Sequence, residues 1–168
     1  MDAFGSQPDT LAGGHDLGSV PSVDRYAGAG RGSTALVVED DFGSRLALTA
    51  LLERSRLTVI AADSGQAALD TLQQRDDVGI VLMDIMMPSM DGYEAMSAIR
   101  QRPEHAGLPI IAVTAKDGEG ESARCLVAGA SRYIPKPIEA AKLLTAVGEL
   151  LTNAGSELSD GDLGFSGR

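Results

Sequence analysis

The chain has 168 residues, of which 43% are hydrophobic, and its 24 acidic side chains exceed its 14 basic ones to give a net charge of −10. This length predicts one soluble globular domain. The acidic balance argues against direct binding of nucleic acid, because phosphate backbones are held by clustered Lys and Arg. A single cysteine, Cys125, excludes an internal disulfide framework and a cysteine-based zinc site, and it is typical of a reducing cytoplasm. The apolar runs are too short for a membrane helix and the first residues do not resemble a signal peptide, so no membrane insertion is predicted.

The two ends of the chain differ in composition from its middle. Residues 1–33 are rich in Gly and lack a periodic apolar pattern, so they are predicted to form a disordered tail or a linker. Residues 153–168 have the same character with additional acids, and they are predicted to form a second disordered tail. The remaining residues, 34–152, are enough for one hydrophobic core and too few for two.

Within 34–152, short apolar runs typical of strands alternate with stretches of helical period. In chain order, the predicted elements are strand 35–38, a helix after the N-cap Asp41, strand 57–61, a helix opened by a capping box of Asp63 and Gln66, strand 79–83, helix 92–102, strand 109–113, helix 121–128, strand 132–134 and helix 139–152. Strands that alternate with helices predict right-handed crossovers and a parallel sheet covered on both faces, which is an α/β fold.

Charged and hydroxyl side chains follow the carboxyl ends of four of these strands, where open α/β sheets bind their ligands. They are Glu39, Asp40 and Asp41 after the first strand, Asp84 after the third, Thr114 after the fourth and Lys136 after the fifth. Converging carboxylates repel one another unless a cation lies between them, and Mg²⁺ is the expected cation because it prefers oxygen ligands. Lys136 and Thr114 suit phosphoryl oxygens. The pattern predicts a phosphoryl-transfer site with a carboxylate nucleophile, whereas Asp41 is interpreted as an N-cap.

Four segments, LVVEDD (36–41), VLMDIMMPSMDG (81–92), IIAVTA (110–115) and GASRYIPKPI (129–138), resemble the receiver domain of two-component response regulators. The resemblance covers residues 34–152. It implies a flavodoxin-like receiver fold, in which a five-stranded parallel sheet of strand order 2-1-3-4-5 carries helices on both faces. It also implies that Asp84 is the phosphoacceptor and that Glu39 and Asp40 hold Mg²⁺ together with Asp84.

The same resemblance assigns five further roles. The backbone carbonyl of Met86 would be another metal ligand, Lys136 would pair with the phosphoryl group, and Thr114 would donate a hydrogen bond to it. Tyr133 would be an aromatic switch that turns inward when Thr114 moves. The peptide bond between Lys136 and Pro137 would be cis, which is essentially a property of bonds that precede proline.

The implied function is to take a phosphoryl group onto Asp84 from a histidine kinase or a histidine phosphotransfer protein and then to switch a protein-interaction surface. Such a domain catalyses its own modification and is not a conventional enzyme. The stretch KDGEGESARCLVAGASRYIPKPI (116–138) resembles receivers attached to hybrid histidine kinases. A free-standing regulator and a piece of a hybrid kinase both remain open, and in the second case residues 1–33 would be the linker from the kinase core.

Two other functional classes share features with this sequence. A phosphatase of the haloacid-dehalogenase type also forms an aspartyl phosphate, but it needs a second Asp two residues after the nucleophile, where this chain has Met86. A receiver-like module that binds proteins without phosphorylation is the stronger alternative. Such modules usually lose the acceptor or the lysine, and this chain keeps both Asp84 and Lys136.

Overall fold

The computed structural model describes residues 34–116 and 118–157, so the predicted tail 1–33 and residues 158–168 lie outside the described part of the chain. A five-stranded parallel sheet in the order β2-β1-β3-β4-β5 forms its centre. Its strands are β1 (Thr34–Val38), β2 (Thr58–Ala62), β3 (Val78–Asp84), β4 (Ile110–Thr114) and β5 (Arg132–Pro135). The predicted fold class and strand order are confirmed.

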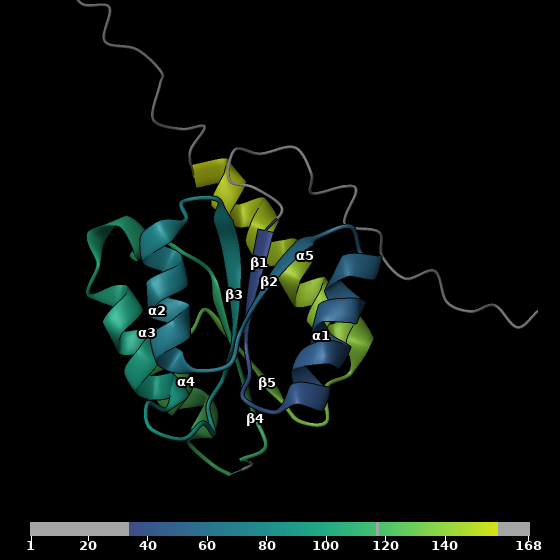
Figure 1. The fold of residues 1–168 in the computed structure, drawn as a ribbon. Helices are drawn as coiled ribbons and strands as arrows, with labels where there is room; N and C mark the ends of the chain where they lie inside the picture. The colour runs from purple at the N-terminus through teal and green to yellow at the C-terminus, as the bar shows by residue number, and fades with distance from the viewer. Residues whose placement is uncertain (1–33, 117, 158–168) are drawn as a thin grey trace, which may run out of the picture.

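Helices cover both faces of this sheet. They are α1 (Phe42–Arg54), α2 (Gly65–Gln74), α3 (Gly92–Arg100), α4 (Glu121–Ala128), α5 (Ala140–Glu157) and the short 3-10 helix η2 (Pro103–His105). Figure 1 shows α1 and α5 on one side of the sheet and α2, α3 and α4 on the other. In the described part of the chain, no helix has the length and the apolar character that crossing a membrane requires.

The strands supply two hydrophobic cores because their side chains alternate between the two faces. In β1, Leu36 and Val38 join the core under α2, α3 and α4, whereas Ala35 and Val37 join the core under α1 and α5. All residues of β1, β3 and β4 are buried. This explains why these strands appear in the sequence as continuous apolar runs instead of alternating ones.

The start of one helix and the ends of two others differ from prediction. The predicted capping box at Asp63 is wrong, because Ser64 is the N-cap of α2 and its side chain accepts a hydrogen bond from the amide of Ala67 at 3.1 Å. Helix α3 ends at Arg100 because Arg102 precedes Pro103 and has an extended backbone, as proline favours in its predecessor. Helix α5 continues past Thr152 to Glu157. The predicted N-cap Asp41 is confirmed, since it accepts from the amide of Ser44 at 2.7 Å.

Arg100 ties α3 to the ends of η2 and α4. Its guanidinium donates to the carbonyl oxygens of Gly129 at 2.9 Å, His105 at 2.8 Å and Leu108 at 2.7 Å. Gly129 ends α4 with a φ of 118°, and a Cβ added there would lie 2.6 Å from Cγ of Arg100. Because these carbonyls and that of Ala106, at 3.3 Å, hold the guanidinium, the Arg100 side chain has little freedom to move away.

We therefore expect Gly129→Ala to lower the free energy of unfolding by about 2 kcal/mol, from the left-handed backbone alone, and the contact with Arg100 adds to this loss. Urea denaturation of both proteins measures the difference. Gly107→Ala is the control, because nothing lies within 4 Å of a Cβ added at Gly107. Equal losses in the two variants would contradict the prediction.

A buried carboxylate joins α3 to α4. The Tyr93 hydroxyl donates to the carboxylate of Glu121, which is only 7% exposed, and the Arg124 guanidinium lies 4.6 Å from the centre of the Tyr93 ring. Burial and the hydrogen bond to Glu121 both raise the pKa of Tyr93, so the tyrosine stays protonated and remains a donor.

Tyr93→Phe is expected to destabilise the domain by about 2 kcal/mol, because it leaves a buried charged acceptor without its hydroxyl donor. Thermal and urea unfolding measure the change. Tyr133→Phe is the matched control, since its hydroxyl bond to the Lys116 carbonyl is exposed and water can replace it. The prediction fails if the two variants lose the same stability.

Candidate functional site

Three carboxylates converge at the carboxyl ends of β1 and β3. Glu39, Asp40 and Asp84 each offer one oxygen, and these oxygens lie within 4.8 Å of one another. The convergence follows from the sheet, because Val38 and Met83 are register partners on neighbouring strands, so the residues that follow them, Glu39 and Asp84, lie side by side. Glu39 and Asp84 are buried, at 1% and 3% exposure, whereas Asp40 is exposed.

The cluster fits a hard divalent cation. All of its donors are oxygens, and the exposed Asp40 leaves one side open, as Mg²⁺ requires to keep water in its shell. Burial and the neighbouring Glu39 carboxylate raise the pKa of Asp84 to about 6, although Lys136 acts in the opposite direction. A cation between these carboxylates would relieve their repulsion. The amide of Met86 lies 3.4 Å from Oδ1 of Asp84, and the role of the Met86 carbonyl stays a prediction.

Lys136 brings a positive charge from β5 to the acidic cluster. Its Nζ lies 2.8 Å from Oε2 of Glu39 and 3.4 Å from Oδ1 of Asp84. Burial opposes the charged form of Lys136, but the hydrogen bond with Glu39 and the charge of Asp84 outweigh it and raise the pKa. The ammonium group is therefore charged. The peptide bond from Lys136 to Pro137 is cis, as the sequence resemblance implied.

Thr114 and Tyr133 both contact the same residue, Lys116. Thr114 is fully buried at the end of β4, and its Oγ1 accepts a hydrogen bond from the Lys116 amide at 3.0 Å. The Tyr133 hydroxyl donates to the Lys116 carbonyl at 3.2 Å. Sequence reasoning missed Lys116 because a residue that acts through its backbone leaves no signal in its side chain.

Arg45 is a second residue that sequence reasoning missed. It lies in α1, and its guanidinium donates to the carbonyl oxygens of Glu39 at 2.7 Å and Asp40 at 3.2 Å. The sequence places an arginine near the start of a helix, where a solvated side chain is the ordinary expectation. Only the folded chain shows that this side chain returns to the end of β1.

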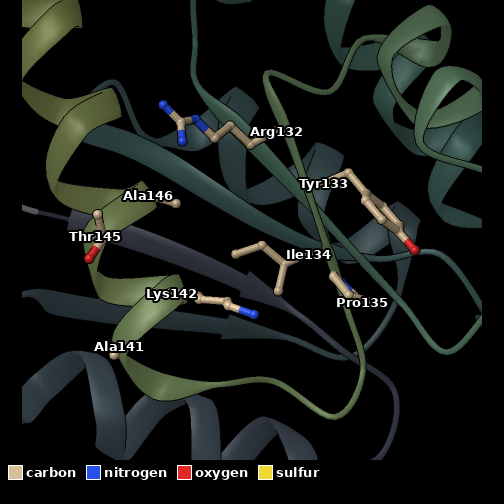
Figure 2. Close-up of a pocket in the computed structure, with 8 residues that line it drawn as sticks. All are labelled: Arg132, Tyr133, Ile134, Pro135, Ala141, Lys142, Thr145 and Ala146. Carbon is tan, nitrogen blue, oxygen red and sulfur yellow. The ribbon is translucent and has the colours of Figure 1, made fainter.

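One hollow adjoins the cluster, and another lies along β5. The first lies beside α1 and is lined by Glu39, Ser44, Ala47, Leu48, Leu51, Lys136, Pro137 and Ile138. The side chains of Phe42 and Leu46, also on α1, are 69% and 58% exposed. The second hollow lies between β5 and α5, where Figure 2 shows Ile134 directed toward α5 and Tyr133 directed away from it.

Comparison with known proteins gives one consistent result. The family model described as the response regulator receiver domain matches residues 35–148. The two-component response regulator ORR7 of Oryza sativa is 31% identical over 116 residues, which are 69% of this chain and 55% of that protein. The signal transduction histidine-protein kinase BarA of Escherichia coli is 39% identical over 110 residues, which are 66% of this chain and 12% of the kinase. This chain thus spans about half the length of the rice regulator and a small part of the kinase.

A solved structure agrees with these relatives. The response regulator receiver protein from Pseudomonas putida superimposes with a TM-score of 0.66 at 27% identity, over 72% of this chain and 98% of that one. The four sequence segments that carry the cluster, Thr114 and Lys136 all lie within the matched residues.

Proposed function

Because this chain belongs to the response regulator receiver domain family of two-component signalling, we propose that it takes a phosphoryl group onto Asp84 and switches a protein-interaction surface in response. The donor is a phosphohistidine on a histidine kinase or on a histidine phosphotransfer protein. One observation carries the proposal: Lys136, from β5, contacts Asp84 and Glu39, from the ends of β3 and β1, in a cluster that Asp40 completes.

In the proposed reaction, an oxygen of the Asp84 carboxylate attacks the phosphorus of the phosphohistidine. An acyl phosphate bond forms, the phosphorus–nitrogen bond breaks, and the donor histidine leaves. Lys136 holds its positive charge 3.4 Å from the attacking carboxylate and can offset the charge of the transferring group. Mg²⁺ held by Glu39, Asp40 and Asp84 would supply further charge neutralisation.

The phosphoryl group on Asp84 would interact with Lys136 and Thr114. A new dianionic group on Asp84 attracts the Lys136 ammonium and accepts a hydrogen bond from the Thr114 hydroxyl. A shift of Thr114 acts on the Lys116 amide and, through the Lys116 carbonyl, on Tyr133. The two states of this connection bias the surface of α4, β5 and α5.

The proposed output surface offers apolar contacts to a protein partner. On α4, Leu126 is 52% exposed and Val127 is 90% exposed. The hollow between β5 and α5 in Figure 2 adjoins Tyr133 on the same strand. A change in Tyr133 would alter the edge of this surface, which supports a protein as the downstream target.

The donor surface lies beside the acidic cluster. Phe42 and Leu46 are one helical turn apart on α1, and other residues of the same helix, Ser44 and Ala47, line the hollow together with Pro137 and Ile138. An exposed apolar stripe next to a carboxylate cluster fits an amphipathic helix that carries a phosphohistidine. This arrangement supports a helical histidine protein as the donor.

The test uses the whole chain with MgCl₂ and acetyl phosphate. We expect a base-labile adduct with the mass of one phosphoryl group, and no adduct when the metal is chelated. If the chain forms no adduct under these conditions, the phosphoacceptor proposal is wrong and the module that acts without phosphorylation becomes the better reading.

A further inference from the structure

We infer that Arg45 is a positioning residue for the acidic cluster: its guanidinium fixes the backbone that projects Glu39 and Asp40, so that these carboxylates can bind Mg²⁺ together with Asp84. The inference rests on the proposed function, because it concerns the same metal site. The positively charged Arg45 would then favour the binding of Mg²⁺, although electrostatic repulsion alone would predict the opposite.

The guanidinium closes a loop at the end of β1. Arg45 lies in the first turn of α1, and one of its terminal nitrogens donates to the carbonyl of Glu39 at 2.7 Å and to the carbonyl of Asp40 at 3.2 Å. These two carbonyls follow the last residue of β1, Val38, and precede the N-cap Asp41. One side chain thus fixes two successive peptide units at the position where the strand becomes a helix.

The Arg45 contact completes the anchoring of Glu39. The Glu39 amide donates to the Ala62 carbonyl at 3.1 Å. Its two carboxylate oxygens accept from the Asp41 amide at 3.1 Å and from Lys136 at 2.8 Å. The carbonyl that Arg45 binds is the remaining polar group of the residue. With Arg45 in place, Glu39 is held through its backbone and its side chain.

Asp40 depends on its backbone for position, because its side chain is exposed. An exposed side chain loses conformational entropy when it binds a metal ion. A fixed backbone reduces this loss, because it holds the side chain close to the binding position beforehand. The Arg45 contact to the Asp40 carbonyl supplies such a constraint. The Phe42 ring, 5.6 Å from the Arg45 guanidinium carbon, restricts the arginine in turn.

The charge of Arg45 and its geometry act on Mg²⁺ in opposite directions. A cation close to a divalent cation repels it, so removing the charge alone would strengthen metal binding. If Arg45 aligns the carboxylates, its removal weakens metal binding instead. The sign of the change in Mg²⁺ affinity therefore separates the two roles.

The experiment titrates MgCl₂ alone into the whole chain and follows backbone amide signals by NMR. We expect Arg45→Met, which keeps much of the side-chain length and removes the donors, to weaken Mg²⁺ binding by about tenfold, as is common when an outer partner of a metal ligand is lost. Arg45→Lys keeps the charge without the planar fork and is expected to weaken binding as well. Arg54→Met, in the last turn of the same helix, is the control and should bind as the parent chain does.

The outcomes are distinct. Unchanged or tighter Mg²⁺ binding by Arg45→Met overturns the positioning role, even if that variant is less stable. The amide spectra report affinity only for folded molecules, so a loss of stability cannot imitate a loss of affinity, and Arg45→Lys serves if Arg45→Met does not fold. If the parent chain binds no Mg²⁺, the metal site of the proposed function fails. If it binds Mg²⁺ and the Arg45 variants bind equally well, only this inference fails.

Discussion

Asp84→Asn is expected to abolish the phosphate adduct completely. The amide has almost the shape of the carboxylate, but it is not a nucleophile toward phosphorus, and it removes one of the three carboxylates of the proposed metal site. The fold should tolerate the change, since Asp84 is buried beside the Glu39 carboxylate and its loss relieves repulsion. We expect no adduct by mass spectrometry and a free energy of unfolding at least as high as that of the parent chain.

Asp41→Asn is the matched control for this experiment. Asp41 lies next to the cluster in the sequence, but it is exposed and caps α1, and asparagine is an equally good N-cap. This variant should form the adduct at the parent rate. An undiminished adduct on Asp84→Asn would place the phosphoryl group on another residue and refute the assignment.

Lys136→Met is expected to slow adduct formation from acetyl phosphate by about a hundredfold, because it removes a cation that contacts the attacking carboxylate at 3.4 Å. Mg²⁺ binding should be kept or become tighter, since the cation that competes for Glu39 and Asp84 is gone. The Lys136 variant is therefore expected to form the adduct more slowly while keeping its Mg²⁺ affinity. The Arg45 variants are instead expected to lose Mg²⁺ affinity.

Adduct formation is followed over time by mass spectrometry at saturating MgCl₂, so that differences in metal affinity do not affect the rates. Lys142→Met is the control, because the exposed Lys142 side chain on α5 pairs with Glu139, which is not part of the cluster. Equal rates for Lys136→Met and the parent chain would show that the Lys136 charge has no part in the transfer.

The site was predictable from the sequence where strands position it. Asp84 and Thr114 are the last residues of strands that are buried on both faces, and such strands are visible as apolar runs. Because parallel strands end at one edge, the sequence already indicated that Glu39, Asp84 and Lys136 would meet. Their convergence is confirmed by the contacts of Lys136.

Contacts that depend on local competition or on long side chains were not predictable in this way. Asp63 and Ser64 are both good N-caps, and the choice of Ser64 depends on a one-residue difference in where the backbone becomes helical. Arg45 and Arg100 bind carbonyls through flexible side chains whose direction is set by the folded surroundings. The spacing of residues in the sequence does not predict such contacts.

The position of Lys116 has a consequence for the range of sequences that this fold can accept. Thr114 binds its amide and Tyr133 binds its carbonyl, so the two side chains of the proposed switch communicate through a peptide backbone. Every residue type has that carbonyl, and every type except proline has that amide. The connection between the Thr114 hydroxyl and the Tyr133 ring therefore does not require a lysine side chain at position 116, and any residue except proline could provide it.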